Sequence, residues 1–158
     1  MHVYKIKAVF IDRDGTINQE KQYINRIEDF ELIPGSLEAL KLLTQYGIKI
    51  YIITNQAGIA KGFFTIEQFQ HLTEYMINRF ENEGIKIEKV LYCPHHPDGI
   101  VAEYAKDCLY RKPNTKLLKD VIEENNYQVD EIVLIGDKNT DIEAGKRLGI
   151  KTFLVETG

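Results

Sequence analysis

The chain has 158 residues, enough for one domain to bury a hydrophobic core without disulfide or metal support. Its hydrophobic share of 44% and charged share of 28% are ordinary for a globular protein. The net charge of −4 gives no general attraction to nucleic acid or to an anionic membrane, so we expect neither as a partner. We predict a single domain over residues 1–158 that is a monomer.

Cysteine content and the N-terminus bear on the compartment. Only Cys93 and Cys108 occur, too few for a disulfide framework, which fits a reducing environment. The first residues lack the apolar core of a signal peptide, and no apolar stretch has the length of a membrane span. We therefore expect a cytoplasmic protein.

Residues 8–11 form a short apolar run that predicts a buried strand. The run ends in Asp12 and Asp14, whose side chains leave an extended backbone on the same side, and Gly15 then allows the chain to turn. Two carboxylates at one strand end repel each other unless a cation or a shared proton settles the charge. Mg²⁺ suits such oxygen ligands, although an isolated Asp-x-Asp is more typical of a strand that simply ends at water.

The next segments predict a loop, a helix and a second strand. The polar stretch 18–29 directly follows the carboxylates and suits a substrate-contacting loop. Ser36 is a candidate N-cap for a helix that ends at Gly47. Residues 48–53 predict a second buried strand, which runs into Thr54-Asn55.

A capping box at residues 65–68 predicts a helix that ends at Gly84. Its aromatic and methionine side chains recur at helical spacing, which is typical of core packing rather than of a cofactor site. Residues 90–92 predict a short third strand. The long segment 93–113 shows little periodicity, and a stretch of that size within one domain is usually functional.

The last third of the sequence predicts two more helices and two more strands. Thr115 is placed to cap a helix, and residues 131–135 predict a fourth strand. A second capping box at residues 140–143 predicts a helix that ends at Gly149. Residues 152–155 predict a fifth strand.

Strands that alternate with helices indicate an α/β fold: a doubly wound parallel sheet of about five strands with helices on both faces. No segment is long enough for a large cap domain. In such sheets ligands bind beyond the carboxyl ends of the strands. Three predicted strands end in reactive side chains at that edge: Asp12 with Asp14, Thr54 with Asn55, and Asp137 with Lys138.

These side chains suit phosphoryl transfer. Asp12 can attack phosphorus to give an acyl phosphate, and Asp14 is close enough to protonate the leaving alkoxide and later to activate water. Mg²⁺ between Asp12 and Asp137 would neutralise the approaching anions. Hydrogen bonds from the strand-end donors and the positive charge of a lysine would stabilise the phosphoryl oxygens, a role we predict for Thr54, Asn55 and Lys112.

The ordered set Asp12-Arg13-Asp14-Gly15-Thr16, Thr54-Asn55, Lys112 and Gly136-Asp137-Lys138 with Asp141 resembles the motifs of the haloacid dehalogenase (HAD) superfamily of phosphatases. Within it, residues 55–62, 92–97 and 111–113 resemble the D,D-heptose 1,7-bisphosphate 7-phosphatases. The histidinol-phosphate phosphatases share much of this set. The run Gly-Ile-Ala-Lys-Gly at 58–62, followed by two phenylalanines, leans toward the heptose branch.

The resemblance implies a Rossmann-like HAD fold and a Mg²⁺-dependent phosphoric monoester hydrolase with Asp12 as nucleophile and Asp14 as general acid and base. It also implies Mg²⁺ ligation by Asp12, Asp137 and the backbone carbonyl of Asp14. The product would be a heptose 1-phosphate for surface polysaccharide synthesis, including lipopolysaccharide. The sugar-phosphate contacts implied by matching positions are Glu20, Lys21, Gln22, Tyr23, Asn55, Gln56, Ala57, Arg111 and Lys138.

The family resemblance also implies a zinc-binding loop, held by Cys-x-His and a later Cys-x-Cys. Here Cys93, His95 and Cys108 match three of these ligands, but Tyr110 stands at the fourth. Structural zinc normally takes four ligands. We leave two readings open: a zinc site completed by another side chain (His96, Asp98 or Asp107), or two free thiols and a loop held by packing.

Other functions remain possible from the sequence. Histidinol phosphate or another small phosphomonoester is the main alternative substrate. A receiver-like phosphoacceptor module also places Asp and Lys at the ends of parallel strands, but its acidic pair and its phosphorylated Asp lie on different strands, unlike Asp12 and Asp14. An inactive binding domain is disfavoured because no expected catalytic residue is missing.

Overall fold

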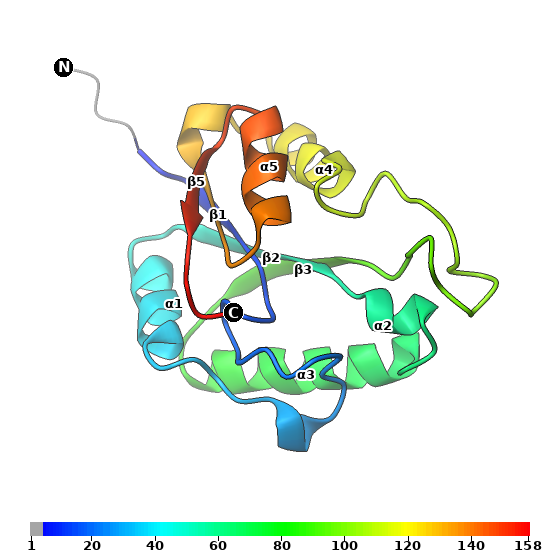
Figure 1. Ribbon diagram of the computed structural model, residues 1–158. Helices are drawn as coiled ribbons and strands as arrows, with labels where there is room; N and C mark the ends of the chain where they lie inside the picture. The colour runs from blue at the N-terminus through cyan, green and yellow to red at the C-terminus, as the bar shows by residue number, and fades with distance from the viewer. Residues whose placement is uncertain (1–4) are drawn as a thin grey trace.

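A computed structural model describes residues 5–158 and has a five-stranded parallel sheet at its centre (Figure 1). The strand order is β3-β2-β1-β4-β5, with β1 in the middle. This arrangement confirms the predicted doubly wound α/β fold. The strands are β1 (Ala8–Ile11), β2 (Lys49–Asn55), β3 (Ile87–Cys93), β4 (Ile132–Gly136) and β5 (Lys151–Leu154).

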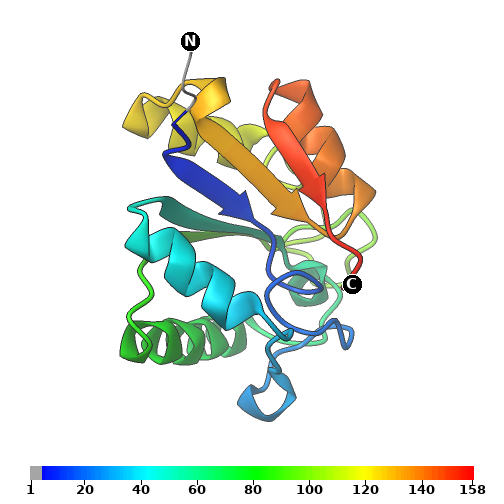
Figure 2. The same ribbon diagram turned by 90° about the vertical axis from the view of Figure 1, so that its left-hand side faces the viewer.

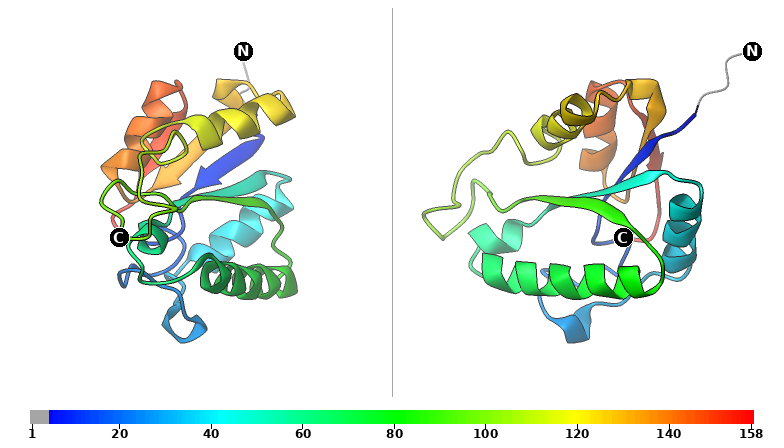
Figure 3. Two further views of the ribbon diagram at one scale, coloured as in Figure 1. Left: turned by 90° about the vertical axis from the view of Figure 1, so that its right-hand side faces the viewer. Right: turned by 180° about the vertical axis from the view of Figure 1, so that it is seen from behind.

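Helices cover both faces of the sheet, as Figure 3 shows from two further sides. The helices α1 (Ser36–Gln45) and α3 (Ile66–Asn82) lie on one face, and α4 (Lys116–Asn125) and α5 (Asn139–Arg147) lie on the other. A four-residue helix, α2 (Ala57–Ala60), follows β2 directly. Two single-turn 3-10 helices, η1 (Ile27–Asp29) and η2 (Val129–Glu131), complete the elements.

The alternation of side chains in β1 divides the core between these two faces. Val9 and Ile11 pack with residues of α1 and α3, while Ala8 and Phe10 pack with residues of α4 and α5. All four side chains are buried, which is why this strand reads as a continuous apolar run rather than an alternating one. Each large side chain buried in this way contributes about 1.5–3 kcal/mol.

The capping predictions had mixed outcomes. The box at Thr65 is confirmed, since its hydroxyl accepts from Gln68 N at 3.1 Å and its own N–H donates to Gln68 Oε1 at 2.8 Å. The prediction that Ser36 caps α1 is wrong, because Gly35 (φ 92°) is the N-cap and Ser36 is the first helical residue. The Ser36 hydroxyl instead donates to the backbone oxygen of Thr16 at 3.4 Å.

The helix α5 also begins differently from the prediction. The expected box at residues 140–143 is wrong, because Lys138 is the N-cap and its backbone N–H donates to the Asp141 carboxylate at 3.2 Å. Thr115 is at the N-cap of α4 as predicted, but its side chain makes no capping bond. The helix α2 was not predicted from the sequence, and the strands β2 and β3 are longer than predicted.

All five strands run the same way, so their carboxyl ends meet at one edge of the sheet (Figure 2). The segment after β3, residues 94–115, passes over this edge beside α2, where the N–H groups of Ile100 and Val101 both donate to the backbone oxygen of Ala60. Among residues 5–158, no helix combines the length and hydropathy needed to cross a membrane.

Candidate active site

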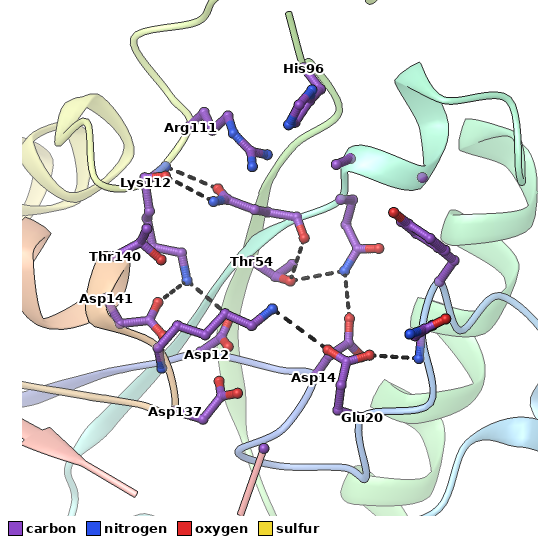
Figure 4. Close-up of a pocket in the computed structure, with 18 of the residues that line it drawn as sticks. Asp12, Asp14, Glu20, Thr54, His96, Arg111, Lys112, Asp137, Thr140 and Asp141 are labelled. Carbon is purple, nitrogen blue, oxygen red and sulfur yellow. Dashed lines mark hydrogen bonds and ion pairs between the residues drawn. The ribbon is translucent and has the colours of Figure 1, made fainter. Parts of the chain in front are cut away.

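A cavity of about 520 Å³ opens at the carboxyl edge of the sheet (Figure 4). The side chains that follow β1, β2 and β4 line it together with parts of three loops and of α2. The predicted site residues that line the cavity are Asp12, Asp14, Glu20, Gln22, Tyr23, Thr54, Asn55, Gln56, Ala57, Arg111, Lys112, Asp137 and Lys138. Residues far apart in the sequence are thus brought together as the strand ends predict.

Lys112 forms the centre of the charge network in this cavity. Its Nζ lies 2.9 Å from Asp12 Oδ1, 2.5 Å from Asp141 Oδ1 and 2.8 Å from the backbone oxygen of Ile53. Only 4% of the residue is exposed. Burial alone would lower the pKa of Lys112, but the two carboxylates outweigh it, and the pKa lies above its ordinary value. Lys112 is therefore a fixed positive charge beside Asp12.

Asp137 faces Asp12 across the floor of the cavity. Burial, followed by the nearby carboxylate of Asp12, raises the pKa of Asp137 to about 7. Carboxylate oxygens of Asp12, Asp137 and Asp141 all lie within 4.8 Å of one another. Three acids gathered around one lysine leave excess negative charge, and a hard divalent cation would compensate it. The donor set therefore fits Mg²⁺.

Gly15 makes room for this cluster. Its φ of 89° is a left-handed conformation that favours glycine, and a Cβ there would lie 2.3 Å from Asp137 Oδ2. The turn that follows Asp14 can thus pass directly beside Asp137. The neighbouring hydroxyl of Thr16 donates to Asp137 Oδ1 at 3.3 Å.

The Asp14 carboxylate is held by four donors. Arg13 donates to both oxygens, Nε to Oδ1 at 2.9 Å and a terminal nitrogen to Oδ2 at 3.0 Å. Asn18 Nδ2 adds a bond of 2.9 Å to Oδ1, and Gln56 Nε2 adds one of 3.1 Å to Oδ2. Burial would raise the pKa of Asp14, but Arg13, Asn18 and Gln56 outweigh it and lower the pKa. Asp14 is therefore ionised in the absence of a ligand.

Thr54 and Asn55 end β2 but have different surroundings. The Thr54 hydroxyl accepts from Gln56 Nε2 at 2.9 Å and can turn its own proton toward a ligand. The Asn55 amide makes two reciprocal bonds with the backbone of Lys112: Nδ2 donates to the Lys112 oxygen, and Oδ1 accepts from the Lys112 N–H, each at 3.0 Å. The predicted role of Asn55 as a phosphoryl donor stays a prediction, and the two bonds show that this side chain also holds Lys112.

The mouth of the cavity is formed by the loop after β1. Tyr23 stacks on Phe63 with ring centroids 4.4 Å apart, and Lys61 Nζ lies 3.2 Å from the Tyr23 hydroxyl. Glu20 and Lys138 approach from opposite sides, with 3.6 Å between carboxylate and ammonium. These residues place both charge signs and an aromatic wall around the entrance.

Cys93, His95 and Cys108 form a second cluster, away from the cavity. One potential ligand atom from each lies within 4.8 Å of the others, with 3.8 Å between Cys93 Sγ and His95 Nδ1. Cys93 is buried at the end of β3, and burial raises the pKa of its thiol to about 12. The backbone N–H of Tyr110 donates to Cys108 Sγ at 3.4 Å.

Known proteins resemble this chain over nearly its whole length. A family model described as HAD-hydrolase-like matches residues 109–158. The D-glycero-alpha-D-manno-heptose-1,7-bisphosphate 7-phosphatase of Photorhabdus laumondii is 45% identical over 155 residues, which cover 98% of this chain and 85% of that protein. The D-glycero-beta-D-manno-heptose-1,7-bisphosphate 7-phosphatase of Pasteurella multocida is 43% identical, with coverage of 96% and 83%. This chain belongs to the HAD heptose-bisphosphate phosphatase family.

Solved structures of HAD phosphatases have the same fold as this chain. The D,D-heptose 1,7-bisphosphate phosphatase of B. bronchiseptica, complexed with magnesium and phosphate, matches with a TM-score of 0.87 at 28% identity, over 97% of this chain and 82% of that one. A HAD-like phosphatase from Mesorhizobium loti matches with a TM-score of 0.88 at 32% identity, over 98% and 74%. The predicted family and fold class are both confirmed.

One of the predicted substrate contacts does not line the cavity, and its role stays a prediction. Lys21 does not line the cavity; its ammonium pairs with Glu31 at 2.8 Å on the outer side of the loop. The next two residues, Gln22 and Tyr23, have φ angles of 58° and 53°, and this left-handed turn brings them into the cavity wall while Lys21 remains outside.

Four residues of the site were given no functional role from the sequence: Arg13, Asn18, Thr140 and Asp141. Asp141 was recognisable as part of the HAD motif set, but its partner Lys112 was not evident from spacing. Thr140 lines the cavity beside it (Figure 4). Asn18 and Arg13 act on Asp14 from a turn whose backbone closes through an Asp14–Asn18 bridge, and no local pattern indicates that turn.

Proposed function

We propose that this protein is a Mg²⁺-dependent phosphatase that removes the 7-phosphate of D-glycero-D-manno-heptose 1,7-bisphosphate. The observation that carries the proposal is the convergence of Asp12, Asp14, Thr54, Lys112 and Asp137 on one cavity. The relatives named as heptose-bisphosphate phosphatases, with 83–85% of their length covered, support the choice of substrate. They include enzymes named for either anomer of the sugar.

Asp12 is the nucleophile in this proposal. A carboxylate oxygen of Asp12 bonds to phosphorus while the bond to the sugar oxygen breaks, and the electron pair of that bond stays on the sugar oxygen. The result is an acyl phosphate on Asp12 and a free heptose 1-phosphate. Lys112 and the Thr54 hydroxyl stabilise the phosphoryl oxygens, and the Lys112 ammonium also donates to Asp12 Oδ1.

Asp14 moves the protons. The arriving phosphate dianion favours the protonated form of Asp14, which then gives its proton to the leaving sugar oxygen. The carboxylate so formed takes a proton from the water that attacks the acyl phosphate. The water oxygen bonds to phosphorus, the bond to Asp12 breaks, and inorganic phosphate leaves. Asp12 ends the cycle as a free carboxylate, and Asp14 releases to solvent, when phosphate leaves, the proton that it took up from solvent when the substrate bound.

Mg²⁺ would be held by Asp12, Asp137 and the backbone carbonyl of Asp14. Burial and the nearby Asp12 carboxylate raise the pKa of Asp137, and a bound cation would favour its charged form again. When bound, Mg²⁺ neutralises charge between the carboxylates and the phosphoryl group. The B. bronchiseptica relative, whose structure contains magnesium and phosphate, supports this assignment.

The rest of the sugar phosphate would occupy the mouth of the cavity. Arg111 and Lys138 are cations that line it and can bind an anionic or hydroxyl-rich group. Tyr23 offers a flat apolar surface, and Glu20 and Gln22 offer hydrogen-bond acceptors for sugar hydroxyls. Gln56 and Ala57 lie at the start of α2 on the opposite wall.

Zinc is the second proposed metal. Cys93, His95 and Cys108 would hold Zn²⁺ through three protein ligands, because Tyr110 offers only a backbone N–H to Cys108 Sγ. Residues 5–158 contain no other cysteine or histidine within ligand distance of this cluster. Bound zinc would tie the end of β3 to the loop that carries Arg111 and Lys112.

A phosphate-release assay with Mg²⁺ tests the proposed function. The substrates are both anomers of the heptose 1,7-bisphosphate, heptose 7-phosphate, histidinol phosphate and a series of common sugar monophosphates. We expect the highest kcat/KM with one heptose bisphosphate anomer. Higher kcat/KM with histidinol phosphate would replace the substrate, and a stable phosphorylated Asp12 without turnover would favour a phosphoacceptor module.

A further inference from the structure

Arg13 is the largest fully buried side chain among residues 5–158, with 0% exposure. It lies between the proposed nucleophile and the proposed acid–base residue but lines no part of the cavity. A guanidinium taken out of water loses hydration worth several kcal/mol unless good partners replace it. The partners of Arg13 therefore indicate what the residue is there to do.

The main partner of Arg13 is the Asp14 carboxylate. Nε and a terminal nitrogen reach one carboxylate oxygen each, at 2.9 and 3.0 Å, so the two planar groups meet through two parallel hydrogen bonds. Such a fork fixes both the position and the plane of a carboxylate, which a lysine ammonium cannot do.

Packing holds the guanidinium itself in place. Its central carbon lies 5.5 Å from the centroid of the Phe69 ring in α3, and that ring packs on Tyr92 of β3 with 4.4 Å between centroids. Phe69 is 2% exposed. The chain of contacts thus runs from the aromatic core through the buried Arg13 to Asp14, which lines the cavity.

Two further donors complete the setting. Asn18 Nδ2 and Gln56 Nε2 bond to Oδ1 and Oδ2 of Asp14, and Gln56 also donates to the Thr54 hydroxyl. These two donors restrain Asp14 from the sides, but neither contacts both oxygens. Arg13 alone among these three side chains bonds to both oxygens, so it restrains the rotation of the carboxyl group about its bond to Cβ most directly.

We propose that Arg13 is a positioning residue that holds the Asp14 carboxyl group in line with the oxygen of the leaving group. The proposal rests on the proposed function, because it concerns proton transfer in that reaction. A general acid works only when its proton lies within hydrogen-bond reach of the acceptor, and small misplacements cost large factors in rate. Arg13 itself touches neither the substrate nor the metal.

The leaving group separates this role from a merely structural one. A sugar alkoxide is a poor leaving group and needs the proton from Asp14, whereas p-nitrophenolate leaves without one. A misplaced Asp14 should therefore slow phosphoryl transfer from a sugar phosphate much more than from p-nitrophenyl phosphate. A general loss of structure would slow both alike. The parameter to compare is kcat/KM, which reports the steps up to phosphoryl transfer.

The experiment measures kcat/KM for the sugar phosphate and for p-nitrophenyl phosphate in wild type, R13K, R13Q and D14N. We expect R13K and R13Q to lose about 10²–10³-fold on the sugar phosphate and less than about fivefold on the aryl phosphate. D14N should show the same pattern, and R13Q should cost little more in the D14N background. Equal losses on both substrates would overturn the proposal.

Two controls separate the possible failures. If wild type hydrolyses another aliphatic phosphate but not heptose bisphosphate, the proposed substrate fails while the same comparison still tests Arg13. If neither Arg13 variant folds, the wild-type guanidinium is followed by NMR with vanadate bound. The fork predicts slow rotation about its Nε–Cζ bond, and free rotation would overturn the proposal.

Discussion

The ammonium of Lys112 lies 2.9 Å from Asp12 Oδ1, although the two residues are 100 positions apart in the chain. The same ammonium contacts Asp141 of α5 and the backbone of β2, so one buried side chain joins three segments that end at the carboxyl edge of the sheet. The catalytic arrangement and the stability of this edge therefore depend on the same contacts.

Replacement of Lys112 should damage both activity and stability. The K112M variant keeps most of the side-chain volume but leaves Asp12 and Asp141 buried without a counter-charge, so we expect a loss of about 3–5 kcal/mol in the free energy of unfolding. Turnover should fall below detection. Urea unfolding and phosphate release measure the two effects. K119M is the matched control, because Lys119 is exposed on α4; unchanged stability in K112M would contradict the network described here.

Asn55 should act through Lys112 rather than on the phosphoryl group. N55A removes both bonds to the Lys112 backbone, each worth about 0.5–1.5 kcal/mol, and lets the lysine shift. We expect a 10–100-fold lower kcat, and little further loss when N55A is combined with K112R, which keeps the positive charge and measurable turnover. Independent, multiplying losses would restore Asn55 as a direct donor. N125A controls for the loss of an amide-to-backbone bond, since Asn125 Nδ2 donates to the Val121 oxygen far from the site.

Asp137 should make the metal-free protein less stable as the pH rises. Its pKa of about 7 in the folded state exceeds the ordinary aspartate value of 3.8, so between these values the folded state holds a proton that the unfolded state has lost. The contribution of this group to stability is full below pH 4, declines up to about pH 7 and is then constant. Urea unfolding in EDTA from pH 4 to 8 should show this slope, and D137N should reduce it. An equal slope in D137N would contradict the assignment.

Zinc retention should depend on residue 110. Three protein ligands hold zinc less firmly than four, so wild type should lose zinc to a mild chelator faster than Y110C, which restores a fourth ligand. C108S should retain less zinc than either protein. Metal analysis after dialysis gives the zinc content per chain. Equal retention in wild type and Y110C would mean that another group already completes the site.

Much of this site was predictable because parallel strands bring their carboxyl ends to one edge. Asp12, Thr54 and Asp137 each follow an apolar run, and topology alone places them together. Lys112 was also predicted to reach the phosphoryl oxygens, but no strand pattern fixes its position. The division into one domain, the monomeric state and the cytoplasmic location stay predictions.

The surroundings of the remaining site residues have physical causes that a linear pattern does not contain. Asn55 ends β2 as predicted, but whether its amide meets a ligand or a neighbouring backbone depends on the loop 57 residues later. Tyr23 lines the cavity and Lys21 does not, because the backbone turns through a left-handed conformation at Gln22 and Tyr23. Arg13 looks like an ordinary charged residue in sequence, and only its burial against Phe69 reveals its contact with Asp14.

The central claim is that Asp12 attacks phosphorus at the end of β1. Its most direct test is phosphate release from heptose 1,7-bisphosphate by wild type and by D12N, both with Mg²⁺ and both shown to be folded. D12N removes the nucleophilic oxygen and keeps the size of the side chain, so turnover should fall by at least about 10⁴-fold. Turnover by D12N within tenfold of wild type would contradict the mechanism.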